Sequence, residues 1–174
     1  MDQTRAVPDS DEGASDLEAI VRAGRDDHKL ELRLWLRLLA TTKLISQEIR
    51  RRLRLEFDAT LPQFDILAQL YREPDGLRLG ELSRRTMVTN GNVTGIIDRL
   101  VADDLVERTT PDDRRVTIAK LTPRGHTLFS RMADAHESWL KELLHGLPDD
   151  EMRAVVDGMG RLKRYAATIV VEQS

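Results

Sequence analysis

The stretch that decides the fold is Leu79–Thr122, LGELSRRTMVTNGNVTGIIDRLVADDLVERTTPDDRRVTIAKLT. Along this stretch the spacing of the apolar residues changes from three or four positions to two. The first spacing is typical of amphipathic helices and the second of half-buried strands. The stretch therefore predicts two short helices followed by a β-hairpin, which is the order of elements in a winged helix-turn-helix.

The second of these helices is the candidate for reading nucleic acid. Thr89 occupies the position of an N-cap, because a short hydroxyl side chain there can accept a hydrogen bond from the first turn. The apolar positions that follow at helical spacing are Val93, Ile96, Ile97, Leu100 and Val101. A helix whose first turns carry short polar side chains is suited to the major groove of DNA.

The hairpin has a basic tip. Its expected strands are Leu105–Arg108 and Val116–Leu121, which are rich in β-branched residues. Between them, residues 109–115 have turn chemistry and end in Arg114 and Arg115. A basic loop of this kind can enter a minor groove beside the reading helix.

The composition favours a mainly α fold with a small β-hairpin. The chain has 174 residues, of which 33% are charged and 4% aromatic. This length allows one domain, or a small domain with helical extensions. High charge with few aromatic residues indicates long solvated helices and argues against an all-β fold.

Several classes of protein are excluded or disfavoured. No apolar run is long enough for a membrane span, and the acidic N-terminus does not resemble a signal peptide, so we expect a cytoplasmic protein. The chain has no cysteine, which excludes disulfides and thiolate chemistry. Its four histidines form no ligand pair at helical spacing, so we expect no metal and no cofactor.

The net charge of −3 is unusual for a nucleic-acid binder, but its distribution removes the difficulty. Residues 1–27 contain eight acidic and three basic residues, a local charge of −5. The remainder carries a small positive charge, and several arginines lie in or beside the expected reading unit.

Four segments are expected along the chain. Residues 1–27 form an acidic leader that is partly disordered, and residues 28–60 form an amphipathic N-terminal helix for dimerisation. Residues 61–122 form the winged helix-turn-helix, and residues 123–174 form two C-terminal helices for dimerisation. The apolar faces of the end helices exceed what the small winged unit can cover, which favours a homodimer; the alternative is that they pack within their own chain.

In its motifs the sequence resembles the MarR family of transcriptional regulators. The resemblance lies in Asp98-Arg99-Leu100, in Leu105–Arg108, in Asp113-Arg114-Arg115, and in Leu121-Thr122 followed by Gly125. It implies a homodimer whose two DNA-binding lobes meet a pseudo-palindromic operator in double-stranded DNA. It also implies that Arg115 reaches the minor groove while Asp113 holds its guanidinium; the alternative is a solvated turn pair.

The remaining DNA contacts are expected from the reading helix and from nearby arginines. Short polar side chains in the first two turns can reach base edges, and the arginines are better suited to phosphates. The expected contacts are Thr89, Asn90, Asn92 and Thr94 for bases, and Arg84, Arg85 and Arg99 for phosphates. Gly91 and Gly95 replace larger residues common in the family; they allow either close approach to the groove or tight packing between helices.

The resemblance also implies release from DNA by a small effector. The first helix offers Arg33, Trp35, Arg37 and Lys43, which either line an anion pocket or form a solvated face with one packing tryptophan. The chain is similar to the branch of the family that controls breakdown of hydroxycinnamates and related aromatic acids. The effector implied is therefore an aromatic acid or a hydroxycinnamoyl-CoA thioester.

Two other classes of function are alternatives to a DNA-binding repressor. An enzyme is disfavoured, because the sequence contains no phosphate-binding glycine loop and no nucleophile motif. A winged-helix module for protein–protein contact would be expected to carry apolar anchors where this chain has the Arg114-Arg115 tip.

Overall fold

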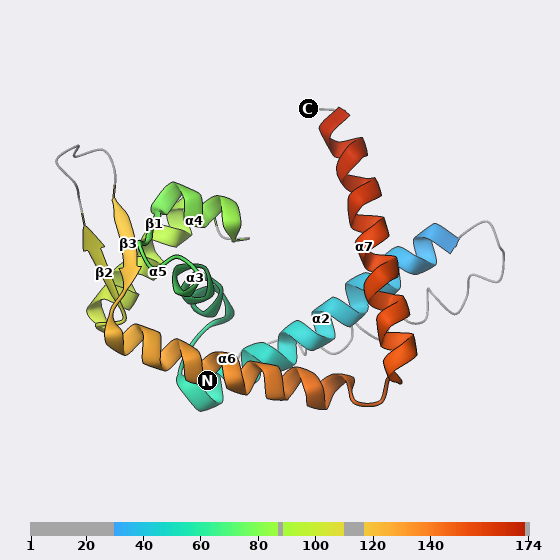
Figure 1. Ribbon diagram of the computed structural model, residues 1–174, viewed down its shortest axis with the longest axis horizontal. Coiled ribbons are helices and arrows are strands. Elements are labelled where there is room, and N and C mark those ends of the chain that lie inside the picture. The colour runs from blue at the N-terminus through green and yellow to red at the C-terminus, as the bar shows by residue number, and fades with distance from the viewer. Residues whose placement is uncertain (1–29, 87–88, 110–116, 173–174) are drawn as a thin grey trace, which may run out of the picture. The chain divides into compact units, whose positions relative to one another are not determined.

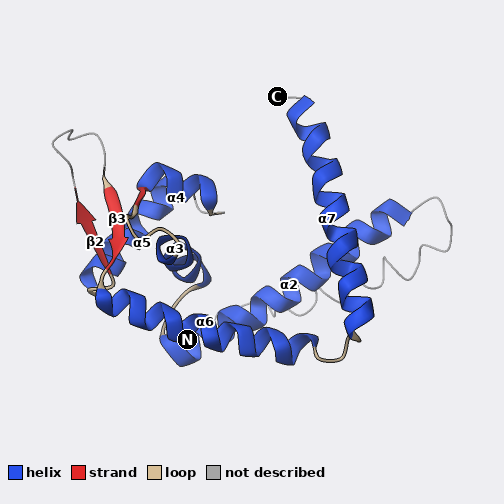
Figure 2. Ribbon diagram, in the orientation of Figure 1, coloured by secondary structure: helices blue, strands red, loops and turns tan. Residues whose placement is uncertain are grey.

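The structure is a computed structural model that describes residues 30–86, 89–109 and 117–172 (Figure 1). The chain divides into two compact units, Met1–Phe129 and Ser130–Ser174. The first unit contains three strands and the helices α2 (Leu30–Phe57), α3 (Leu61–Tyr71), α4 (Leu79–Arg85) and α5 (Asn90–Ala102), and the start of α6 (Pro123–Leu144). The second contains the rest of α6 and α7 (Asp149–Glu172). The predicted fold class, mainly α with a small β element, is confirmed (Figure 2).

Helix α3 begins with a complete capping box. The Thr60 hydroxyl accepts a hydrogen bond from the Gln63 backbone N–H, and Gln63 Oε1 accepts one from the Thr60 backbone N–H at 2.8 Å. Pro62 lies in the first turn, where its missing N–H costs no helical hydrogen bond. The reciprocal bonds fix the start of α3 and the position of the Gln63 side chain.

The sheet has one strand more than the hairpin expected from the sequence. Strands β2 (Val106–Thr109) and β3 (Ile118–Leu121) pair antiparallel, and β1 (Leu77–Arg78) pairs with the other edge of β3, giving the order β1-β3-β2. Gly76 enters β1 with a φ of +84°, and a Cβ there would lie 2.5 Å from the Ala119 carbonyl oxygen. Glycine is therefore required for β1 to reach β3.

The core of the first unit lies between α3, α4, α5 and the inner face of the sheet. Helix α3 contacts α4, α5 and β3, and α5 contacts α4 and β2. The side chains that are almost completely buried in this unit are Leu53, Ile66, Leu67, Leu70, Leu82, Val93, Ile97, Leu100, Val106 and Ala119. Burial of this apolar surface stabilises the unit and fixes the orientation of α5.

The start of α6 is fastened to the turn that follows α5. Thr122 donates its hydroxyl to the Asp104 carbonyl at 2.8 Å and accepts a hydrogen bond from the Gly125 backbone N–H at 2.9 Å. A Cβ on Gly125 would lie 1.9 Å from the Leu105 carbonyl oxygen. The Leu-Thr and glycine motif therefore has a packing reason, since only glycine lets the helix approach the backbone of Leu105.

The outer helices expose much of their apolar surface. In α2 only Ile49 and Leu53 are buried, whereas Trp35 is 58% exposed. In α7, Val156 is 64% exposed. Among the described residues, no helix combines the length and apolarity that crossing a membrane would require.

Candidate nucleic-acid interface

Helix α5 presents a polar face to solvent because its apolar residues are used for packing. Val93, Ile97 and Leu100 are buried against the rest of the unit. Thr89 occupies the N-cap with an extended backbone, as predicted, but its side chain makes no capping hydrogen bond. Its exposed hydroxyl therefore remains available to a ligand.

The predicted base-contacting residues lie along the first two turns of α5. Asn92 and Thr94 are exposed. Asn90 opens the helix, and its side chain lies outside the described part of the structure. Asn92 and Thr94 are thus accessible from solvent, and their contact with base edges in the major groove stays a prediction.

The two glycines of α5 have open space around them. A Cβ built on Gly91 or on Gly95 meets nothing within 4 Å. Tight packing between helices therefore does not explain these glycines in the described structure. The other alternative, close approach of the helix to a groove, stays a prediction.

Arg108 connects the hairpin to α5, a role that the sequence did not reveal. Its Nη2 lies 2.6 Å from the Asp98 carboxylate and donates a hydrogen bond to the Thr94 carbonyl at 3.3 Å. We call these two contacts the Arg108 brace. They fasten β2 to the middle of α5, so that the strand leading into the wing and the reading helix are positioned together.

The arginines predicted to contact phosphates differ in their surroundings. Arg85 is ion-paired with Glu73 at 2.7 Å and with Glu81 at 2.6 Å, and the hydrogen bonds that it donates to Glu73 and then to Glu81 raise the pKa of its guanidinium. Arg84 and Arg99 are exposed and make no ion pair with any described residue. Of the three, Arg84 and Arg99 are the ones with uncommitted charge.

The predicted wing residues Asp113, Arg114 and Arg115 lie outside the described residues. The described strands lead into the segment that contains them: β2 ends at Thr109 and β3 begins at Ile118.

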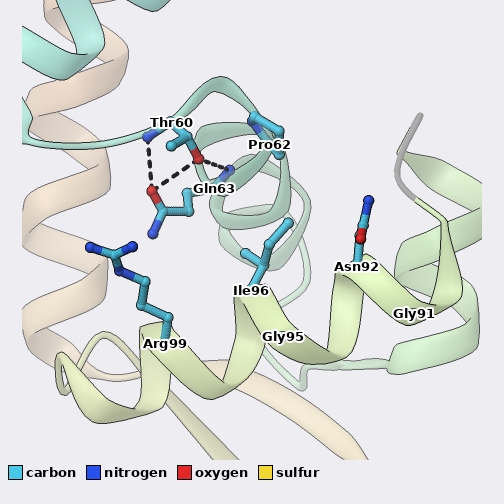
Figure 3. A pocket seen from close by; sticks show the side chains of 8 residues that line it. All are labelled: Thr60, Pro62, Gln63, Gly91, Asn92, Gly95, Ile96 and Arg99. Carbon is cyan, nitrogen blue, oxygen red and sulfur yellow. Dashed lines mark hydrogen bonds between the residues drawn. The ribbon is translucent and has the colours of Figure 1, made fainter. Parts of the chain in front are cut away.

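A partly open pocket of about 460 Å³ lies between the start of α3 and the side of α5 (Figure 3). From α3 and its cap it is lined by Thr60, Pro62 and Gln63, and from α5 by Gly91, Asn92, Gly95, Ile96 and Arg99. Gln63 is 8% exposed and is the buried polar residue of the described core. The pocket thus brings polar groups of two helices together directly beside the predicted reading surface.

The residues predicted to bind an effector all lie on α2 and do not line this pocket. Trp35, Arg37 and Lys43 are exposed, and Arg33 has a buried Nε without a hydrogen-bond partner. The neighbouring Arg51 and Arg52 are ion-paired with Glu48 at 2.7 and 2.6 Å. Hydrogen bonds from Arg51 and then Arg52 lower the pKa of Glu48 from 4.5 to about 2.

The described histidines show no arrangement for metal binding. His126 stacks on Tyr71 with ring centroids 4.3 Å apart, and His145 bonds the Glu142 carbonyl through Nδ1. Within the described residues, no group of three or more His, Asp or Glu side chains is placed to hold a metal ion.

Comparisons with known proteins agree with this geometry. A family model described as the MarR family matches residues 57–116. A crystal structure of a MarR family transcriptional regulator from Silicibacter pomeroyi is 36% identical, covers 83% of this chain and 99% of its own, and superposes with a TM-score of 0.68.

Curated relatives are also transcriptional regulators. The uncharacterised HTH-type transcriptional regulator YsmB of Bacillus subtilis is 31% identical over 72% of this chain and 84% of its own length. The HTH-type transcriptional repressor YetL of the same organism is 31% identical over 58% of this chain and 61% of its own. The winged unit, its polar reading helix and these matches together show that the chain belongs to the MarR family of DNA-binding transcriptional regulators.

Proposed function

We propose that this chain is a homodimeric repressor in the cytoplasm that binds a pseudo-palindromic operator through α5 and the wing. The observation that carries the proposal is the exposed polar face of α5, fastened to β2 by the Arg108 brace. Such a unit presents a helix and a hairpin to adjacent grooves of one duplex. The relative YetL is named a repressor, which supports the direction of control.

Dimerisation follows from the apolar surface of the end helices. Leu34, Trp35 and Leu39 in α2 are 42% or more exposed, as are Val155 and Val156 in α7. Large exposed apolar side chains gathered on amphipathic helices favour an interface. A two-fold dimer would cover these faces and set two reading helices at the spacing of two half-sites.

The wing assignment is tested with Arg115→Ala. If Arg115 enters the minor groove, the variant binds a selected operator more weakly, and the affinity depends less steeply on salt because fewer counterions are released. Gel-shift titrations across a salt series measure both effects. Arg5→Ala, in the acidic leader, is the matched control, and binding by Arg115→Ala that equals wild type would end the assignment.

A small effector is the second part of the proposal. Trp35 exposes an aromatic ring on α2, and Arg37 and Lys43 add exposed cations to the same helix, Arg37 on a different side from Trp35. An aromatic acid or a hydroxycinnamoyl-CoA thioester has the matching chemistry. Calorimetry with p-coumaroyl-CoA, p-coumarate and coenzyme A tests this, and the absence of heat from all three would count against the proposal.

One experiment distinguishes DNA binding from the alternative, a winged helix that binds another protein. A pull-down with biotinylated duplex DNA should retain the chain at low salt and release it at high salt, since phosphate contacts dominate affinity. A chain that is never retained would favour the alternative.

A further inference from the structure

We propose that Gln63 and Arg99 together hold one backbone phosphate of the operator in the pocket between α3 and α5. The inference deepens the proposed function and rests on it, because the phosphate belongs to the duplex that α5 reads. It adds α3 to the elements that position the reading helix on DNA.

The first step concerns the unused hydrogen-bonding capacity of Gln63. The side-chain oxygen is occupied, because it accepts hydrogen bonds from the Thr60 backbone N–H at 2.8 Å and from the Thr60 hydroxyl at 3.0 Å. The side-chain nitrogen, Nε2, has no partner within the described part of the chain. The nitrogen keeps access to the open pocket, because the fully buried side-chain polar atom without a partner in the described residues is Arg33 Nε. Its N–H groups are therefore free to donate to a ligand in the pocket, while the rest of the side chain is held in a residue that is 8% exposed.

The second step concerns where the side-chain nitrogen of Gln63 points. The capping box fixes which end of the Gln63 amide faces Thr60, and Figure 3 shows the nitrogen turned into the pocket, on the side where the Arg99 guanidinium lies. Arg99 is exposed and has no ion pair with a described residue. An uncharged donor and a cation therefore face the same space, and the ligand they suit is an anion with several acceptor oxygens.

The third step concerns the electrostatics around these donors. The pocket is lined by no acidic side chain, and the positive end of the α3 macrodipole points toward it. By contrast, Arg85 and Arg108 are already paired with carboxylates. Of Arg84 and Arg99, whose charges are both uncommitted, Arg99 is the one that lines the pocket, so its charge is available to a phosphate there.

The fourth step distinguishes a nucleic-acid phosphate from a free anion. The pocket is partly open and larger than a phosphate group, and its other walls are apolar, from Pro62, Ile96 and the glycines of α5. An apolar wall beside an anion site matches a deoxyribose followed by its phosphate. The pocket also borders Asn92, so a strand that passes through it is the strand flanking the groove that α5 enters.

The experiment compares Gln63→Glu with Gln69→Glu, using the dimeric full chain and an operator selected from a random duplex library. Both changes add the same charge to α3, so long-range repulsion is matched. Gln63→Glu keeps an oxygen for Thr60 and places a carboxylate at the third helical position, where it favours the helix, so the fold is retained. Thermal unfolding of both variants verifies this.

We expect Gln63→Glu to weaken operator binding roughly ten- to a hundredfold relative to Gln69→Glu, because a hydrogen bond to a charged group is lost in each half-site. The slope of log K against log salt should become shallower by about 1.8, because the new carboxylate at position 63 neutralises Arg99, so that a dimer loses two phosphate contacts made by a cation. Arg99→Gln should cost much less in the Gln63→Glu background than in wild type, because both residues serve one phosphate.

Two outcomes overturn the inference and are distinguishable from failure of the proposed function. If Gln63→Glu and Gln69→Glu bind the operator with the same affinity and slope, the pocket holds no phosphate of the duplex. If the effects of Arg99→Gln and Gln63→Glu simply add, the two residues do not share a phosphate. If instead the wild-type chain selects no duplex at all, the proposed function itself fails.

Discussion

Gly125 and Gly95 show at the residue scale that helical glycines can have opposite causes. At Gly125 a Cβ would lie 1.9 Å from a carbonyl oxygen, so the glycine is imposed by the fold. At Gly95 a Cβ would meet nothing within 4 Å, so the fold would accept a side chain there. Gly125 is therefore required for the stability of the fold, whereas no contact within the described unit requires Gly95.

Gly125→Ala should therefore lower the free energy of unfolding by about 2 kcal/mol or more, because the added methyl group overpacks a backbone contact. Gly80→Ala is the matched control, since nothing lies within 4 Å of a Cβ there and alanine favours the helix by up to about 1 kcal/mol. Denaturant unfolding at fixed protein concentration measures both. A Gly125→Ala variant as stable as wild type would contradict the described junction.

Glu48 predicts a pH dependence. Its pKa is about 2 in the folded chain against an ordinary value of 4.5, so its contribution to stability is full above pH 4.5 and is lost as the pH falls toward 2. Glu48→Gln should thus differ from wild type at neutral pH and converge with it near pH 2. Glu56→Gln, in the same helix and without a described ion pair, is the matched control, and unfolding curves across this pH range are the measurement.

At the residue scale, local positions could be predicted and distant partners could not. Thr89 at the N-cap and the exposure of Asn92 and Thr94 follow from spacing over a few residues. The pairing of Arg85 with Glu73 joins positions 12 apart, and the Arg108 brace joins a strand to a helix. Such contacts depend on the tertiary fold, for which the spacing of residues carries no signal.

At the scale of the element, α5 combines good packing with weak intrinsic helix propensity. Its inner face is buried, yet two of its exposed positions are glycines, each of which costs about 1 kcal/mol relative to alanine. Because the glycines lower helix propensity and give no packing benefit in return, we infer that they serve contact with a ligand of α5.

Gly95→Ala should accordingly raise the free energy of unfolding by up to about 1 kcal/mol and weaken operator binding at the same time. A gain in stability together with a loss of operator affinity would indicate that Gly95 serves approach to the groove. If the glycine served the fold, its substitution would lower the free energy of unfolding. Chemical unfolding and gel shifts on the same preparation measure the two quantities. Unchanged operator affinity would remove the glycine from the reading surface.

The helices can be predicted because each repeats its apolar residues over many positions: the sequence predicts an N-terminal helix within residues 28–60, and α2 is Leu30–Phe57. Strand β1 was missed because it has two residues and exists through pairing with β3. A segment this short has no periodicity of its own. What places it is the positive φ of Gly76 and the edge that β3 offers.

At the scale of the whole molecule, the exposed apolar face of α7 predicts how the dimer can be broken. Val156→Asp should shift the chain toward monomer, because it places a carboxylate in surface that a partner would bury. Ala154→Asp is the matched control, since residues two apart lie on different sides of a helix. Sedimentation velocity at micromolar concentration measures the shift, and an unchanged dimer would exclude this face.

Assembly and effector are the properties that one chain's sequence specifies least. The amphipathic pattern of α2 and α7 shows that an apolar face exists, but the same pattern serves packing within a chain or between chains. The division into dimerisation segments and a DNA-binding segment, with boundaries at residues 60 and 122, therefore stays a prediction, because a partner chain is needed to define a dimerisation segment. The effector residues on α2 also stay a prediction, because a bound effector is needed to define them.

The Arg108 brace has a consequence for exchanging specificity between relatives. A hairpin transplanted from another family member would bring its own residue opposite Asp98, and a mismatch would leave that carboxylate without its cation. The hairpin and α5 should therefore be exchanged together between relatives, and substitutions at positions 98 and 108 should occur as a pair. Chimeras that cut between α5 and β2 are expected to lose operator discrimination more often than chimeras that keep both.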